Sequence, residues 1–426
     1  MGILTEKAKK YISPVLGKYF SDLEIVKGQG VYVFDPDGKR YLDFAAGIGV
    51  VSTGHCHPKV VEAIVKQTHE LIHIMGGIAY SPPYVNLAEL LVSISPFKEA
   101  SVVLTQSGSE AIEACLKLAK YVSNKRKVVA FSHAFHGRTL GATAVTYKEK
   151  YKHGYEDWLL EVVRAPYPYY FHNKDLSFQE YETEIINQVR DIICQDSEIG
   201  AVIIEPVLGE GGYVPAPQRF LIELRRITEE HNVLLIFDEV QSGMGRTGKW
   251  FASEHYGVVP DIIALAKGIA SGMPLGACIA KKEIMDKWSR AAHGGTYIGN
   301  PVTCAAALAT IDVIKREKLL ENSAEVGDYL KEELQKVFAG FPQVGDIRGL
   351  GLMIGIEFVN PTTGEGDPVI VSKIRNIALS KGLILISCGD SDQIIRLIPP
   401  LIINRFQVDE GVKILLESVQ EAIREV

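Results

Sequence analysis

The sequence lacks paired cysteines and long apolar runs. Its 426 residues include only six cysteines, and no two of them form a C-x-x-C pair. Cysteines this sparse do not make a disulfide scaffold, so we expect buried, reduced thiols. No apolar run approaches the ~18 residues that a membrane-spanning helix needs, and the first residues lack the apolar segment of a secretory signal. These absences predict a cytoplasmic protein that does not bind membranes.

An excess of charge of one sign is also missing. Lys and Arg number 45 against 52 Asp and Glu, which gives a net charge of −7. Nucleic-acid binders normally carry a basic patch, and no Lys/Arg-rich block is present, so a nucleic-acid partner is not expected. A single hydrophobic core rarely grows past ~250–300 residues. The length therefore predicts two domains.

Short apolar runs alternate with longer amphipathic stretches through the middle of the chain. The clearest runs are SVVLT (101–105), VVAFS (128–132), AVIIEPV (201–207), VLLIFDEV (233–240) and DIIALA (261–266). Such continuous apolar strands are typical of parallel strands that helices cover on both faces. The pattern predicts an α/β fold with a mostly parallel central sheet wrapped by helices.

The two ends of the chain have a different pattern. DPDG at 35–38 is a strong turn signal between two alternating segments and predicts a hairpin. Helices and strands are mixed after residue 300. We therefore expect a large domain over 61–300 and a small α+β domain assembled from 1–60 and 301–426.

Two familiar motifs occur without the context that their chemistry needs. His69–His73 matches H-E-x-x-H, but no third ligand follows, so we expect no metal site. Gly243–Gly248 matches G-x-G-x-x-G after a strand, yet only a short segment ending at Gly257 follows, and no acidic ribose partner is evident. We interpret this second motif as a backbone turn.

Three other features follow predicted parallel strands. Ser107-Gly108-Ser109 precedes a helix, where small residues let backbone N–H groups approach a phosphate. Asp238 ends one strand, and Lys267 follows another. Taken singly, these residues could be a helix cap, a strand-end cap and a lysine that reaches solvent. Together they predict a pyridoxal 5'-phosphate site, in which Lys267 holds the aldehyde and Asp238 keeps the pyridine nitrogen protonated.

Eight motifs carry a resemblance to a known family. They are GHCHP (54–58), SGSEA (107–111), FHGRT (135–139), EPVLGEGG (205–212), DEVQSGMGRTG (238–248), PDIIALAKGIASGMPLGA (260–277), GGTYIGNP (294–301) and RGLGLMIGIE (348–357). In this order they resemble the class III aminotransferases of fold type I, which depend on pyridoxal phosphate. The resemblance covers essentially the whole chain and is strongest to the 4-aminobutyrate aminotransferase branch.

The resemblance implies roles around the cofactor. Lys267 forms the internal aldimine and later moves a proton, and Asp238 pairs with the pyridine nitrogen. Gln241 would hydrogen-bond the phenolic oxygen, while Phe135 and Val240 would face the two sides of the ring. The implied cofactor-binding positions are Ser107, Gly108, Ser109, Phe135, His136, Glu205, Asp238, Val240, Gln241, Lys267 and Thr296. Thr296 would reach the partner's cofactor in a homodimer or a higher oligomer.

The resemblance also implies how substrates bind. Arg396 would receive the α-carboxylate of 2-oxoglutarate or glutamate, and Arg138 the far carboxylate. Glu210 would pair with Arg396 when an ω-amino acid is bound. Ile48 stands where ornithine aminotransferases carry a substrate-contacting tyrosine, which disfavours ornithine, and the glycines in 74–77 depart from bacterial 4-aminobutyrate enzymes.

These roles imply amino transfer from an ω-amino acid such as 4-aminobutyrate to 2-oxoglutarate, with pyridoxamine phosphate formed between the two half-reactions. Two alternatives use the same lysine and aspartate. One is an amino-acid racemase or epimerase, and the other is an acetylornithine- or ornithine-type aminotransferase.

Overall fold

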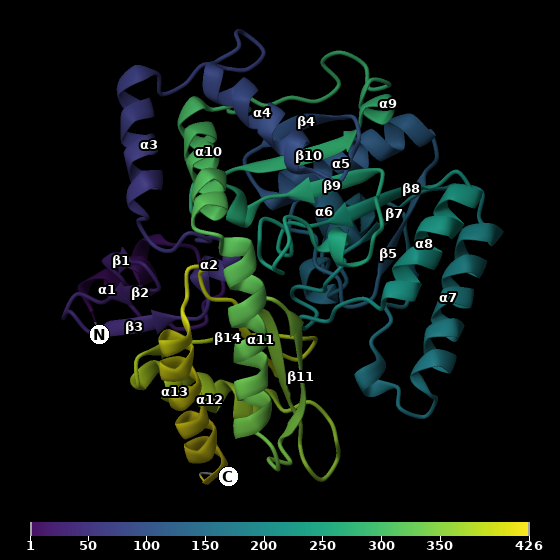
Figure 1. Cartoon of the computed structure of the whole chain (residues 1–426). Coiled ribbons are helices and arrows are strands. Elements are labelled where there is room, and N and C mark those ends of the chain that lie inside the picture. The colour runs from purple at the N-terminus through teal and green to yellow at the C-terminus, as the bar shows by residue number, and fades with distance from the viewer. Residues whose placement is uncertain (1, 425–426) are drawn as a thin grey trace.

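A seven-stranded sheet forms the centre of the computed structural model, which describes residues 2–424 (Figure 1). Across the sheet its strands are β4 (Ala100–Thr105), β10 (Gly276–Lys281), β9 (Ile262–Leu265), β8 (Leu234–Asp238), β7 (Ile199–Ile204), β5 (Lys127–Phe131) and β6 (Val162–Ala165). Only β10 runs against its neighbours, and the strands from β9 to β6 pair in parallel. The predicted α/β fold with a mostly parallel sheet is confirmed.

Helices cover both faces of this sheet. Every residue of β7 is buried, and its side chains alternate between two cores because successive residues of a strand point to opposite faces. Val202 and Ile204 pack in one core with α4 (Pro82–Ile94), α7 (Phe178–Gln195) and α8 (Gln218–Glu230). Ala201 and Ile203 pack in the other with α5 (Gly108–Ser123) and α6 (Leu140–Val145). This burial on both faces explains the continuous apolar runs in the sequence.

Two four-stranded sheets are built from the chain ends. One contains β1 (Lys27–Gln29), β2 (Tyr32–Phe34), β3 (Arg40–Asp43) and β13 (Leu383–Ile384). The other contains β11 (Val344–Leu350), β12 (Met353–Phe358), β15 (Ile394–Leu397) and β14 (Ile386–Cys388). The predicted hairpin at DPDG is confirmed as the antiparallel β2–β3 pair, and β13 pairs in parallel with β3. The two ends of the chain therefore share one structural unit.

A separate core lies between these smaller sheets and three helices. The helices are α11 (Leu319–Val337), α12 (Pro368–Ser380) and α13 (Arg405–Arg424). Helix α10 (Pro301–Arg316) reaches from one core to the other, because Ile311 packs in the large core and Ile314 in the small one. Figure 1 shows α10 running from the central sheet toward α11. The domain limits near residues 60 and 300 stay a prediction.

The two rejected motifs lie in unsuitable structure. Helix α3 (Pro58–Glu70) ends before His73, so the one-turn spacing of a zinc helix is not formed there. Gly243–Gly248 lies in consecutive turns, with positive φ at Gly245 and Gly248, and no α-helix begins there. All six cysteines are free, but our expectation of burial is wrong for Cys56 and Cys194, which are exposed. No helix among the described residues is long and apolar enough to cross a membrane.

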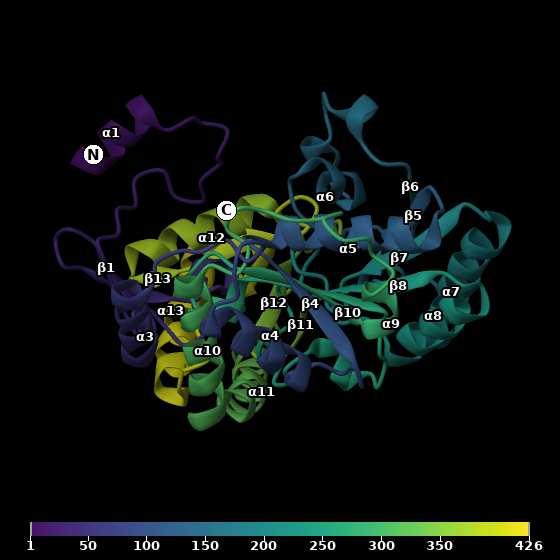
Figure 2. The ribbon, with the colours of Figure 1, turned by 90° about the horizontal axis from the view of Figure 1, so that it is seen from above.

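A short left-handed turn, α2 (Ala46–Gly49), connects β3 to the central part of the protein. All four of its residues have positive φ, including Ile48 at 67°. Left-handed backbone is costly for a β-branched residue, so tertiary contacts must stabilise the turn. The backbone N–H of Ile398 donates to Phe44 O at 2.9 Å on one side of it. Figure 2 shows the N-terminal segment with α1 (Ile3–Tyr11) extending away from the rest of the protein.

Candidate active site

A cavity of about 300 Å³ opens at the carboxyl ends of the parallel strands. In open α/β sheets this edge is where ligands bind. Its lining residues are Val50, Gln106, Ser107, Gly108, Ser109, Phe135, His136, Gly137, Glu205, Asp238, Val240, Gln241, Ala266, Lys267, Gly272, Met273, Pro274 and Leu275. The structure thus brings together ten of the eleven predicted cofactor-binding residues, which come from the loops after β4, β5, β7, β8 and β9.

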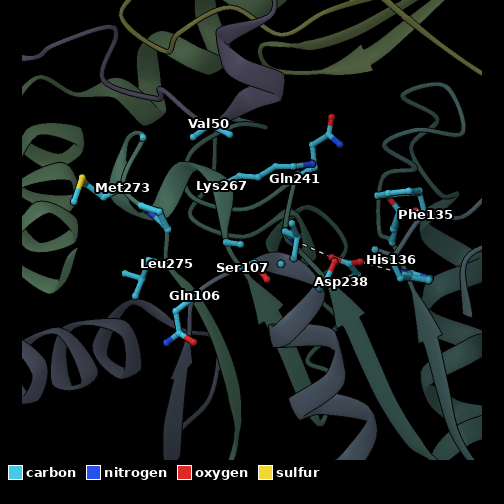
Figure 3. A pocket seen from close by; sticks show the side chains of 18 residues that line it. Val50, Gln106, Ser107, Phe135, His136, Asp238, Gln241, Lys267, Met273 and Leu275 are labelled. Carbon is cyan, nitrogen blue, oxygen red and sulfur yellow. Dashed lines mark hydrogen bonds and ion pairs between the residues drawn. The ribbon is translucent and has the colours of Figure 1, made fainter. Parts of the chain in front are cut away.

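Asp238 is the last residue of β8 and is held by two neighbours. His136 Nδ1 lies 2.7 Å from Asp238 Oδ2, and Val240 N donates to Oδ1 at 3.0 Å. Figure 3 shows His136 and Asp238 side by side, joined by a dashed line. Because its partner is a carboxylate, we assign the hydrogen to Nδ1 as donor. A buried carboxylate fixed in this way suits a protonated ring nitrogen of a ligand.

The N-terminus of α5 forms one wall of the cavity. Ser107 caps the helix by accepting a hydrogen bond from Glu110 N at 3.2 Å, so the helix cap considered from the sequence is present. The N–H groups of the first turn, at Gly108 and Ser109, have no acceptor within the helix and favour an anion. A Cβ at Gly108 would lie 2.9 Å from Val240 Cγ1, so this position requires glycine. The wall is therefore a close-fitting cradle for a phosphate.

Lys267 begins the short 3₁₀ segment η5 (Lys267–Ala270), which is separated from β9 by Ala266 alone. Its φ of 48° is left-handed, a strained conformation that proteins tend to keep at functional sites. Burial lowers the pKa of its ammonium group. The nearby Arg396 acts in the same direction, against the carboxylates of Glu210, Asp238 and Glu205. A lowered pKa favours the neutral amine, which is the nucleophilic form.

Two polar side chains complete the cofactor side of the cavity. Glu205 is buried and accepts hydrogen bonds from Phe135 N at 2.9 Å and Gly209 N at 2.7 Å. Burial, followed by the charge of Asp238, raises the pKa of Glu205 to about 8. Tyr213 donates its hydroxyl to Gln241 Oε1 at 2.8 Å. This bond makes the amide nitrogen of Gln241 the donor that is left for a ligand oxygen.

Arg396 and Glu210 form a partly buried ion pair close to Lys267. Arg396, on β15, is fully buried, and its Nη1 donates to Glu210 Oε1. Its Nη2 donates to the hydroxyl of Tyr19 at 2.7 Å. Burial alone would raise the pKa of Glu210, but the charge of Arg396 outweighs it and lowers that pKa. Tyr19 near the N-terminus and Arg396 near the C-terminus thus meet in the folded chain.

Five predicted site residues lie outside the cavity lining: Arg396, Glu210, Arg138, Thr296 and Ile48. The guanidinium of Arg138 is exposed and lies 4.8 Å from the ring centre of Tyr151. Thr296 is also exposed and does not reach the cavity of its own chain. Ile48 is half-buried and packs against a hydrophobic cluster that includes Tyr41 and Ile398. For these residues the substrate and partner roles stay predictions.

Sequence reasoning missed several residues of the site. Val50, Gln106 and Met273 line the cavity, and Tyr19 and Tyr213 fix Arg396 and Gln241 from outside it. Gln106 stands directly before the Ser107 cap, so its neighbours could have identified it. Tyr19 lies 377 positions from its partner Arg396, and no local pattern signals such a contact.

Comparison with known proteins identifies the class. The profile of the family described as Aminotransferase class-III matches residues 16–419, so the chain belongs to the class III aminotransferases. It is therefore a pyridoxal-phosphate-dependent aminotransferase of fold type I, as predicted. The residues present fit that cofactor on their own chemistry, because an anion cradle, a buried carboxylate and a desolvated lysine face one cavity.

Individual relatives differ in their named reactions. The chain is 39% identical to an alanine/serine racemase of Pyrococcus horikoshii, over 99% of this chain and 90% of that protein. It is 39% identical to a probable 4-aminobutyrate aminotransferase of Bacillus subtilis, over 92% and 91%. It is 40% identical to an acetylornithine aminotransferase of Archaeoglobus fulgidus, over 96% and 99%. A crystal structure of an omega transaminase from Pseudomonas jessenii in complex with PMP superposes with a TM-score of 0.93, covers 100% and 99% of the two chains, and is 26% identical.

Proposed function

We propose that this aminotransferase moves an amino group from an ω-amino acid, such as 4-aminobutyrate, to 2-oxoglutarate. The observation that carries the proposal is the partly buried Arg396–Glu210 pair near Lys267. While Glu210 neutralises Arg396, the site accepts a donor that has no α-carboxylate. When Glu210 moves away, Arg396 can bind the α-carboxylate of an oxo acid through two parallel hydrogen bonds.

The chain's own residues supply positioning and proton transfer. When bound, pyridoxal phosphate supplies the electron sink for the substrate carbon. Asp238, fixed by His136, holds the proton on the pyridine nitrogen, and the α5 N-terminus holds the phosphate. Lys267 Nζ takes the proton from the substrate carbon that carries nitrogen, and its lowered pKa suits this general base. The raised pKa of Glu205, about 8, favours its protonated form and so reduces the negative charge beside Asp238.

Two arginines distinguish the substrates. Arg396 binds the α-carboxylate of 2-oxoglutarate, and Arg138 takes the far carboxylate. With an ω-amino donor, Glu210 stays on Arg396 and only Arg138 binds the carboxylate. Ile48, where ornithine aminotransferases carry tyrosine, leaves an apolar contact for the donor's carbon chain.

We further propose that the active form is a homodimer, in which Thr296 reaches the partner's phosphate. Exposed large apolar side chains support this arrangement, because Ile72, Ile78, Tyr80 and Tyr297 lie exposed in or near the segment that carries Thr296. Six free cysteines support a cytoplasmic location, since reducing compartments keep thiols unpaired.

The test is a donor panel with 2-oxoglutarate. The purified holoenzyme is incubated with 4-aminobutyrate, 5-aminovalerate, acetylornithine or ornithine, and glutamate formation is measured. We expect the highest kcat/KM with an unbranched ω-amino acid, and a higher value for acetylornithine would move the assignment to that branch. No glutamate from any of the donors would overturn the proposed reaction.

A second candidate is an amino-acid racemase, favoured by the 39% identity to the alanine/serine racemase over nearly the whole chain. A racemase needs no oxo acid, because the proton that Lys267 removes is returned to the other face of the same carbon. Incubation of L-alanine or L-serine in deuterated water separates the two. Inversion with α-deuterium incorporation, faster than any glutamate formation, would favour the racemase.

A further inference from the structure

Three cations influence the carboxylate of Glu210. Arg396 holds it directly, and the charges of Arg396, Lys267 and Lys148 each lower its pKa against the effect of burial. Arg396 and Lys267 belong to the site already described. Lys148 lies in the loop after α6 and has no role in that site.

Binding of a dicarboxylate must displace Glu210. Arg396 donates from Nη1 to Glu210 and from Nη2 to Tyr19, so these two residues occupy the guanidinium nitrogens that a substrate carboxylate would bind. A second carboxylate cannot stay on the same buried arginine without strong repulsion. A displaced Glu210 needs another cation, because an unpaired buried carboxylate is costly.

Lys267 is not a suitable second partner. It is buried, and desolvation lowers its pKa, which disfavours the ammonium form that a carboxylate needs. Its nitrogen is also the atom that holds the cofactor. An ion pair with Glu210 would therefore oppose the reaction at the same atom.

Lys148 and Glu210 both hydrogen-bond to Gly389, the residue directly after β14. Its Nζ donates to Gly389 O at 2.5 Å, and Gly389 N donates to Glu210 O at 2.9 Å. The ammonium and the backbone of Glu210 therefore meet at one residue. A Cβ at Gly389 would lie 2.6 Å from Gln393 Oε1, and φ is 90°, so this position favours glycine.

The ammonium of Lys148 also has hydrogen-bonding capacity to spare. It carries three donors, of which the contact with Gly389 uses one. Other cations nearby already have partners. Arg348 is paired with Asp346 and Glu357, while Arg375 donates to Tyr19 and Ser387.

We propose that Lys148 is the alternative partner of Glu210, which receives the carboxylate when a dicarboxylate occupies Arg396. This inference rests on the proposed function, and it makes Lys148 a positioning residue that acts through Glu210. Lys148 stabilises the state in which Arg396 is free, and so increases the affinity for dicarboxylates. A donor that leaves the Arg396–Glu210 pair intact gains no affinity from Lys148.

Ligand binding to the holoenzyme tests the proposal without turnover. Dissociation constants for glutarate, a five-carbon dicarboxylate, and butyrate, a monocarboxylate, are measured by calorimetry. Lys148→Met should weaken glutarate binding roughly tenfold, within the usual range of coupling between two sites, and leave butyrate unchanged. Lys148→Arg keeps the charge and should restore most of the affinity. Lys150→Met, which removes an exposed lysine of the same loop, is the matched control and should change neither constant by more than twofold.

The double variant separates indirect from direct action. In a Glu210→Gln background no carboxylate is displaced, so Lys148→Met should no longer affect glutarate binding. An equal loss in that background would overturn the proposal, because Lys148 would then contact the ligand or support the fold. An unchanged constant for Lys148→Met alone would also overturn it. If the unaltered enzyme does not bind glutarate, both the proposed acceptor and this inference fail. If it binds glutarate and Lys148→Met does not change the dissociation constant, only this inference fails.

Discussion

The site has a cofactor end, which is the cavity, and a proposed substrate end, which is the Arg396–Glu210 pair outside the cavity lining, and the two are built in different ways. At the cofactor end, Asp238 and Lys267 follow neighbouring strands of a single sheet, and their positions are set by backbone pairing. At the substrate end, Arg396, Glu210 and Tyr19 come from three distant segments and meet only through side chains. The first end is a property of the sheet, and the second depends on how the small unit packs against it.

The largest effect is expected at the cofactor end. Lys267→Ala removes both the nucleophile and the general base, and should lower turnover by about 10³-fold or more. The yellow absorption band of the bound cofactor should disappear, while circular dichroism shows a retained fold. Turnover within tenfold of the unaltered enzyme would show that another residue carries the proton.

At the substrate end, loss of one partner should destabilise the protein itself. Arg396→Met leaves Glu210 as a largely buried charge without its partner and should cost about 3–5 kcal/mol of unfolding free energy. Arg396→Met combined with Glu210→Met should recover most of that loss, because no charge is left buried. Urea unfolding measures the free energy of unfolding of both variants, and Arg405→Met, at an exposed position, is the control. A double variant as unstable as the single one would mean that packing, rather than charge, dominates.

The two ends should also respond oppositely to pH. Burial raises the pKa of Glu239, beside Asp238, to about 7, whereas the pKa of Glu210 is lowered. From pH 4.5 to about 7 the folded protein keeps a proton on Glu239 that the unfolded chain has lost. Stability therefore falls as pH rises, by about 3 kcal/mol in total.

Glu210 should have the opposite effect, since its stabilisation is present above about pH 4.5 and is lost as pH falls. Unfolding of Glu239→Gln and Glu210→Gln across pH 4–8 gives the two contributions by difference. Glu239→Gln should flatten the upper part of the curve, although it also weakens bonds to Ala252 and Ser253. Parallel curves for the variant and the unaltered protein would contradict the raised pKa.

The smallest effect is expected from the hydroxyl that orients Arg396. Tyr19→Phe removes a hydrogen bond to a charged group on a partly exposed residue, and should raise KM for 2-oxoglutarate about threefold. The KM for the ω-amino donor should not change. Tyr11→Phe, on exposed α1, serves as the control. Equal changes for both substrates would place Tyr19 at the cofactor end instead.

This difference also explains what could be predicted from the sequence. The apolar run of β8 ends in Asp238, and the apolar run that contains β9 ends just before Lys267. The apolar pattern, the length of each run and the polar residue at its end together indicated the site. Arg396 and Glu210 were identified only through family resemblance. Tyr19 was missed because its contact with Arg396 is created by the fold, and no local pattern signals a hydrogen bond between residues so far apart.

The left-handed turn at Ala46–Gly49 has a consequence for protein engineering. Ile48 occupies a conformation that glycine adopts without cost and that other residues adopt at about 1–2 kcal/mol. Ile48→Gly would thus relieve the backbone while deleting a half-buried apolar side chain. Under the donor contact proposed for Ile48, the same substitution would combine a gain in backbone stability with a loss of selectivity, so selection for thermal stability alone would act against the choice of substrate.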